Sequence, residues 1–141
     1  MALDDSFSGF TPYQPQPDEE YMSEGQKAHF RDILLSWKRE LMAGSQRTVT
    51  HMQDEPLNLP DPNDRASQEE EFSLELRARD RERKLLRKID KAMQRLANDE
   101  YGYCESCGVE IGLRRLEARP TAELCIECKQ VEEIKEKSHA A

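Results

Sequence analysis

Hydrophobic residues recur every three or four positions along an early stretch of this chain. The members of this stripe are Phe30, Ile33, Leu34, Trp37, Leu41 and Met42. The stripe thins out over residues 44–48 and returns at Val49 and Met52. Such spacing places apolar side chains on one face of an α-helix. The pattern therefore predicts a long amphipathic helix.

The ends of this first helix are marked by polar residues and prolines. Ser23 and Gln26 have the spacing of a capping box, which predicts that the helix begins at Ser23. Pro56 and Pro60 end the pattern, because a proline inside a helix removes a hydrogen bond and clashes with the preceding turn.

A second helix is predicted over residues 65–99, which contain no glycine and no proline. Of these 35 residues, 24 are Ala, Glu, Lys, Leu or Arg, a share typical of long helices and coiled coils. The apolar positions are Phe72, Leu74, Leu76, Leu85, Leu86, Ile89, Met93 and Leu96. Between residues 77 and 84 only Ala78 is apolar, so this stripe is also weak in its middle.

Two helices of similar length, joined through residues 56–64, form an antiparallel hairpin. Antiparallel pairing would place Trp37 opposite Leu85, and the weak middle of one helix opposite the charged middle of the other. We therefore predict a mainly α fold in which a coiled-coil hairpin spans residues 23–100, with its tip at 56–66. Its packing should be tight at the base and weaker in the middle.

The two ends of the chain differ from the hairpin. Residues 1–22 contain Pro12, Pro15 and Pro17, which exclude regular helix or strand, yet they hold four of the nine aromatic residues. We expect an extended arm that packs loosely on the rest, or alternatively an arm that binds a partner. Gly102 stops the second helix, and residues 101–141 should form a small globular module ending in a helix over residues 122–137.

Composition supports an elongated molecule. Apolar residues make up 36% of the chain and charged residues 35%, against about 45–50% and 25% in typical globular domains. No apolar run approaches the roughly 20 residues of a membrane span, and the first ten residues do not resemble a secretory signal, so we expect a cytoplasmic location. The net charge of −8 argues against sequence-independent nucleic-acid binding.

Charge is sorted along the predicted hairpin. Residues 54–75 contain eight acids and one base, whereas residues 77–91 contain eight bases and three acids. The hairpin therefore has an acidic end and a basic stem. The basic stretch is either a solvated helix face with local ion pairs or a docking face for an acidic surface or a phosphate ligand.

Two aspartates lie at the predicted tip. Asp61 followed by Pro62 is a typical helix start, and Asp64 then falls where an acid interacts favourably with the helix dipole. Capping alone accounts for both residues. The alternative is that two carboxylates on a rigid projection act inside a narrow cavity, near a cation or a basic group. A general acid–base pair would need a pocket that excludes water, which such a tip lacks.

Four cysteines form two Cys-x-x-Cys pairs separated by 17 residues. They are Cys104, Cys107, Cys125 and Cys128. In a cytosolic chain this spacing predicts one structural zinc ion held by four thiolates, in preference to two disulfides or an iron–sulfur cluster. Four protein ligands leave no open position for water, so such a zinc would not catalyse hydrolysis.

The chain resembles the DksA/TraR family of bacterial RNA polymerase-binding transcription factors. The resemblance covers about residues 17–138 and rests on four motifs. These are Asp-Pro-Asn-Asp-Arg-Ala at 61–66, Glu-Glu-Glu-Phe-Ser-Leu-Glu at 69–75, Gly-Tyr-Cys-Glu-Ser-Cys-Gly-Val-Glu-Ile-Gly at 102–112 and Cys-Ile-Glu-Cys at 125–128. The combination is far more specific than the cysteine spacing alone.

This resemblance implies a coiled coil projecting from a zinc-containing domain. It also implies that the hairpin enters the secondary channel of RNA polymerase, destabilises open promoter complexes and amplifies the response to guanosine tetraphosphate. The residues it assigns to the tip are Asp61, Asp64 and Ala66, and those it assigns to the nucleotide are Lys88, Arg119 and Lys129. We further expect a non-enzymatic monomer that does not bind specific DNA sequences.

Three other classes of function are compatible with parts of the pattern. A zinc-ribbon DNA-binding protein would need a basic surface near the cysteines, but residues 101–128 contain three arginines against five glutamates. A transcript-cleavage factor would use the tip aspartates to hold a catalytic Mg²⁺. A thiol redox sensor or chaperone would expose its thiolates when zinc is released.

Overall fold

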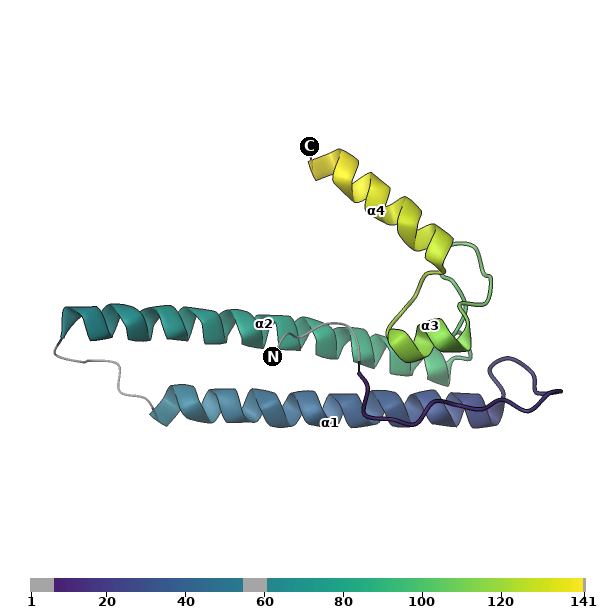
Figure 1. Ribbon diagram of the computed structural model, residues 1–141, viewed down its shortest axis with the longest axis horizontal. Helices are drawn as coiled ribbons and strands as arrows, with labels where there is room; N and C mark the ends of the chain where they lie inside the picture. Colours follow the sequence, from purple (N-terminus) through teal and green to yellow (C-terminus); the bar gives the residue numbers. More distant parts are fainter. Residues whose placement is uncertain (1–6, 55–60, 141) are drawn as a thin grey trace.

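The computed structural model describes residues 7–54 and 61–140, and within them the chain forms four helices. They are α1 (Glu24–Asp54), α2 (Pro62–Ala97), α3 (Leu113–Ala118) and α4 (Ile126–Ala140). Helices α1 and α2 lie side by side as a long antiparallel hairpin, and α4 points away from it (Figure 1). The mainly α fold with a projecting hairpin is confirmed. Residues 55–60 of the expected tip lie outside the described residues.

The start of α1 differs slightly from a reciprocal capping box. The Ser23 hydroxyl accepts a hydrogen bond from the Gln26 amide at 3.3 Å, as the sequence predicts. The Gln26 side chain, however, accepts from the amide of Met22, one residue before the cap, at 2.7 Å. Both amides are still satisfied, so α1 begins at Glu24 without an unpaired amide at these two positions.

The start of α2 follows the local sequence closely. Asp61 is the N-cap residue, with extended backbone angles, and its carboxylate accepts a hydrogen bond from the Asn63 amide at 2.9 Å. Pro62 occupies the first helical turn, where its missing amide proton costs no hydrogen bond. The helix ends at Ala97, and Asp99 then turns the chain with a φ of 58°.

The core is concentrated at the base of the hairpin. Its members are Phe30, Ile33, Leu34, Trp37, Leu41, Leu85, Ile89, Ala92, Leu96, Tyr101, Ile111 and Leu116. The last three come from the cysteine-containing part, so one core joins both parts. Farther out, Leu74 and Leu76 are 56% and 52% exposed although they belong to the predicted stripe. The hairpin is therefore well packed at its base and poorly buried along α2 nearer the tip.

Among the described residues, ion pairs join α1 to α2 and to the turn that follows α2. Lys27 binds Asp99 at 3.0 Å, and Lys38 binds Asp90 at 2.7 Å. The early part of α1 thus lies beside the end of α2, as antiparallel pairing requires. The predicted neighbours Trp37 and Leu85 are both buried in the common core.

The N-terminal arm is anchored more firmly than loose packing would suggest. Residues 7–23 run along α1 without forming a helix, and Phe7 stacks on Trp37 with ring centroids 6.1 Å apart. The Tyr21 hydroxyl donates to the Gly102 carbonyl at 2.7 Å and accepts from the Gly112 amide at 2.9 Å. The arm therefore connects α1 to the cysteine-containing part.

The last part of the chain differs from the prediction at the start of α4 and contains one additional helix. Helix α4 begins at Ile126 rather than at residue 122, because residues 119–122 form a turn in which the Ala122 amide donates to the Arg119 carbonyl at 2.9 Å. The short helix α3 was not predicted.

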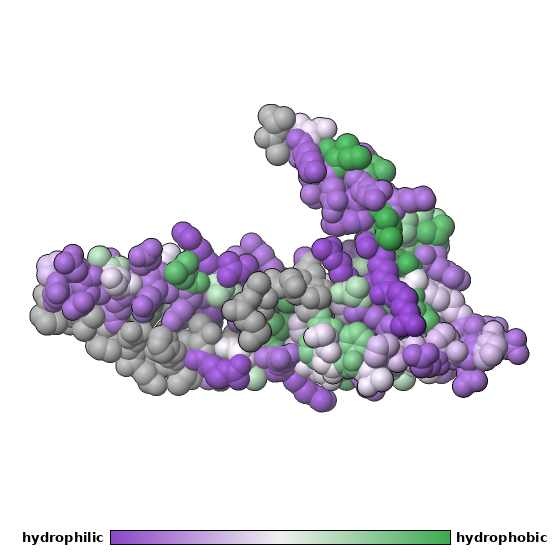
Figure 2. Space-filling view, viewed as in Figure 1, coloured by the Kyte–Doolittle hydropathy of each residue, from purple (hydrophilic) through white to green (hydrophobic). Residues whose placement is uncertain are grey.

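Apolar residues are exposed along α4, whereas polar residues dominate the visible face of the hairpin (Figure 2). No helix in the described ranges is long and apolar enough to span a membrane.

Candidate metal centre and adjoining basic cavity

One loop presents Cys104 and Cys107, and the start of α4 presents Cys125 and Cys128. Cys104 follows α2, and its amide and carbonyl pair with Val109 at 2.8 Å and Gly108 at 3.0 Å, which closes a tight knuckle. Gly108 has a φ of 80°, a conformation that side chains disfavour. Cys125 precedes α4, and Cys128 lies in its first turn. The first Cys-x-x-Cys pair therefore belongs to a tight knuckle, and the second pair belongs to the start of a helix.

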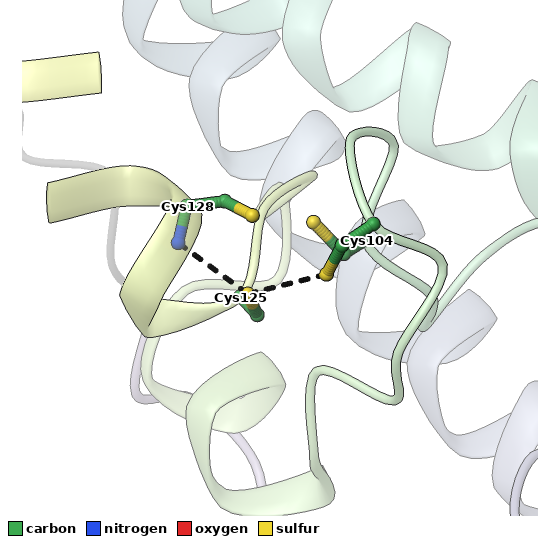
Figure 3. A group of neighbouring side chains, drawn as sticks. Cys104, Cys125 and Cys128 are labelled. Carbon is green, nitrogen blue, oxygen red and sulfur yellow. Dashed lines mark hydrogen bonds between the residues drawn. The ribbon is translucent and has the colours of Figure 1, made fainter. Parts of the chain in front are cut away.

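The four sulfur atoms converge. All of them lie within 4.8 Å of one another, and the sulfurs of Cys107 and Cys125 are 3.7 Å apart. Zinc–sulfur bonds of about 2.3 Å in a tetrahedron would separate the sulfurs by about 3.8 Å. The cysteines are not joined as disulfides. Figure 3 shows the sulfurs of Cys104, Cys125 and Cys128 directed toward a common point. The donor set and its geometry fit one zinc ion.

Two of these thiols differ strongly in how readily they ionise. Burial disfavours the charged form of Cys104, but hydrogen bonds from three backbone amides outweigh burial and lower its pKa to about 6. At Cys128 the hydrogen bonds shared with the other thiols, chiefly that of Cys125, raise the pKa to about 12. The thiolate of Cys104 is therefore favoured and that of Cys128 is opposed, and a divalent cation would offset the repulsion between thiolates at such a site.

Helix α2 holds the cysteine loops through two cations one turn apart. Lys91 pairs with Glu123 at 3.0 Å and with Glu105 at 3.3 Å, and the bond to Glu123 raises the pKa of Lys91. The Glu105 amide donates to the Glu123 carbonyl at 2.8 Å, which joins the two loops directly. Arg95 is buried and donates to the carbonyl of Tyr103 at 2.7 Å. The metal centre is thus attached to the base of the hairpin.

A basic cavity of about 510 Å³ lies beside this attachment. Its lining comes from α2, from Glu105 in the first cysteine loop, from Arg115 of α3, from the loop before α4 and from α4 itself. Lys88, Arg119 and Lys129 all line it, so one residue each from α2, the loop before α4 and α4 converge at one site. Sequence reasoning assigned these residues to a nucleotide only through the family resemblance, and their convergence is a finding of the structure.

The tip residues are in a different environment. Asp61, Asp64 and Ala66 are exposed at the far end of α2, and none of them lines the cavity. The Asp61 carboxylate caps the helix. No group of metal-ligating side chains is found there among the residues that the structure describes. The structure therefore supports the capping role of Asp61 and leaves the charge of both aspartates exposed to solvent.

Sequence reasoning missed a polar cluster between the arm, α1 and α3. The imidazole of His29 lies 3.0 Å from the carboxylate of Glu117, which also accepts from the Tyr13 amide at 2.7 Å. Glu117 is buried. These partners are 88 to 104 residues apart, so no local pattern could have revealed them. The cluster positions α3 and the arm against the base of the hairpin.

Comparison with known proteins agrees with this geometry. Residues 26–96 match the family model described as DnaK suppressor protein DksA, N-terminal domain. Residues 99–133 match the prokaryotic dksA/traR C4-type zinc finger. With the converging sulfurs, the second match identifies the cysteine cluster as a site for one structural zinc ion.

Curated relatives and a solved structure cover nearly the whole chain. The RNA polymerase-binding transcription factor DksA of Escherichia coli (strain K12) is 63% identical over 135 residues, which are 96% of this chain and 89% of that protein. The protein of the same name from Haemophilus influenzae is 60% identical and covers 94% of this chain, with 92% of its own length. The structure of transcription factor DksA2 from Pseudomonas aeruginosa superposes with a TM-score of 0.78 at 46% identity, over 86% of this chain and 94% of that one.

Proposed function

The chain belongs to the DksA family, and from this membership we propose that it regulates transcription by binding RNA polymerase directly. The observation that carries the proposal is the combination of a projecting hairpin and a C4 zinc site, with high identity to relatives named as RNA polymerase-binding transcription factors. These relatives are transcription factors, and the zinc site has no open ligand position, so the role we propose is not enzymatic.

The hairpin is the part that would reach the polymerase active centre through the secondary channel. Helix α2 has 36 residues and is therefore about 54 Å long. Asp61 and Asp64 are exposed at its far end. In this proposal the tip, with Ala66 beside the aspartates, destabilises open promoter complexes, including those at ribosomal RNA promoters. Specific DNA contacts are not needed, and a cytoplasmic monomer suffices.

The basic cavity is the part that would respond to guanosine tetraphosphate. Lys88, Arg119 and Lys129 line one cavity, and three cations from separate elements suit a ligand with two pyrophosphate groups. We place the nucleotide at the interface with polymerase, because the cavity is open to solvent beside the hairpin base.

Binding and regulation can be tested in one purified system. The protein should co-purify with RNA polymerase and shorten open-complex lifetime at a ribosomal RNA promoter, more strongly with guanosine tetraphosphate. Lys88→Ala, Arg119→Ala and Lys129→Ala should weaken the nucleotide response and leave polymerase binding intact. Loss of one charge-assisted bond to phosphate costs roughly 1.5–3 kcal/mol, or at least a tenfold higher half-maximal nucleotide concentration.

A matched control is available one turn away on α2. Lys84 is exposed, pairs with Asp80 at 3.0 Å and does not line the cavity, so Lys84→Ala should respond to the nucleotide like the parent. Failure of the parent to bind polymerase would contradict the whole proposal. Normal nucleotide responses in all three cavity variants would contradict only the assignment of the nucleotide site.

A further inference from the structure

Two of the cations around the cavity are already held by its wall. Lys91 bridges Glu105 and Glu123, and the Arg115 guanidinium donates to the Leu124 carbonyl at 3.2 Å. These bonds fix the loop before α4 against its surroundings. These two cations therefore have a structural role in the wall, and only part of their hydrogen-bond donors remains for a ligand.

Lys129 has a different kind of partner. Its ammonium lies 3.8 Å from the carboxylate of Glu132, one turn farther along α4. Both residues line the cavity, and their side chains are 35% and 48% exposed. A phosphate oxygen and this carboxylate would compete for the same ammonium. The pair is long and solvated, so a ligand can displace it at small cost.

We propose that Glu132 is a positioning residue that weakens phosphate binding in this cavity, by holding Lys129 and by adding negative charge to the lining. The inference rests on the proposed function of the cavity as a guanosine tetraphosphate site. Glu132 then sets the nucleotide concentration at which the protein responds. Removal of its charge should strengthen the response, in contrast to the loss expected from Lys129→Ala.

The adjacent acid provides a control of equal charge. Glu133 follows Glu132 on α4, is exposed and does not line the cavity. Glu132→Gln and Glu133→Gln change the net charge equally. A solvated ion pair of this kind contributes a factor of about two to five, and salt screens its effect. Glu132→Gln should therefore lower the half-maximal nucleotide concentration about two- to fivefold, while Glu133→Gln should leave it unchanged.

The experiment measures open-complex lifetime with RNA polymerase and the full chain as guanosine tetraphosphate is titrated, at low and at high salt. Melting temperatures of the variants check that folding is preserved. The gain from Glu132→Gln should shrink at high salt. It should also be smaller in the Lys129→Ala background, where only the repulsion between the Glu132 carboxylate and the phosphates remains.

Three results would overturn the inference. An unchanged midpoint in Glu132→Gln, with Lys129→Ala still defective, would remove Glu132 from the site and leave the proposed function standing. Equal gains in Glu132→Gln and Glu133→Gln would show a general effect of net charge. Normal responses in Lys88→Ala, Arg119→Ala and Lys129→Ala would remove the nucleotide site itself, and the inference with it.

Discussion

Replacing the two tip aspartates by asparagine separates the charge of the tip from its role in starting α2. The Asp61 carboxylate accepts one hydrogen bond, from the Asn63 amide at 2.9 Å. An asparagine side chain caps a helix about as well, so Asp61→Asn should cost little stability. Asp64 lies in the first turn, and its interaction with the helix dipole contributes about 0.3–1 kcal/mol. The double variant should therefore unfold within about 1 kcal/mol of the parent.

Regulation should respond very differently. If the charges act inside the polymerase channel, the double variant loses its effect on open-complex lifetime at a ribosomal RNA promoter. Competition for polymerase binding should persist, because docking would use the stem and the zinc-containing part. Asp61→Ala serves as the contrasting change, since it removes both the charge and the cap and costs about 0.5–2 kcal/mol.

Two outcomes would refute this reasoning. Full regulation by the Asp61→Asn, Asp64→Asn variant would show that the charges are not required, and a defect confined to Asp61→Ala would then assign the aspartate to capping. Loss of polymerase binding together with regulation would instead make the tip a determinant of affinity.

Two further predictions concern the metal centre and the arm. Cys104→Ser should abolish zinc binding, measured by elemental analysis, because it removes one of the four ligands. The cysteine loops should then unfold, since structural zinc contributes about 10–16 kcal/mol in small peptides, while circular dichroism should retain most of the helical signal. Retention of zinc by this variant would contradict the ligand assignment. Hydrogen bonds from the hydroxyls of Ser23 and Tyr13 lower the pKa of Glu19 to about 2. The stability that the ionised Glu19 carboxylate adds to the attachment of the arm should therefore be complete above about pH 4.5 and be lost as the pH falls toward 2. Trp37 fluorescence should report this loss because Phe7 stacks on that ring, and Glu19→Gln should remove the dependence; the same acid transition in both proteins would contradict it.

The hairpin and the zinc site could be predicted from sequence because local rules dictate both. A helical stripe over dozens of residues fixes α1 and α2, and the pair Asp61 and Pro62 specifies where α2 begins. The cysteine spacing encodes a knuckle and a helix start. Each helix, each cap and each Cys-x-x-Cys pair depends on neighbours a few residues apart, so these parts can be recognised in the sequence.

Other features depend on contacts that the sequence does not bring together. Helix α3 has six residues, too few for a periodic pattern, and its position follows from burial of Leu116 in the shared core. The link from Tyr21 to Gly102 spans 81 residues. Arg119 and Lys129 reach the cavity beside Lys88 of α2 because of the path of the loop that precedes α4. Such features become visible only when the core has placed each element.

Because the hairpin is long and is packed mainly at its base, a small rotation at the core produces a large displacement at the tip. From Ile89 in this core to Pro62 at the far end, α2 extends about 40 Å, so a rotation of about 5° at the core would displace the far end by about 3.5 Å, more than the length of a hydrogen bond. Packing around Phe30, Trp37 and Ile89 therefore determines the position of the tip aspartates as well as the stability of the fold. A substitution that changes the packing of this core can displace the aspartates while it leaves every residue near them unchanged.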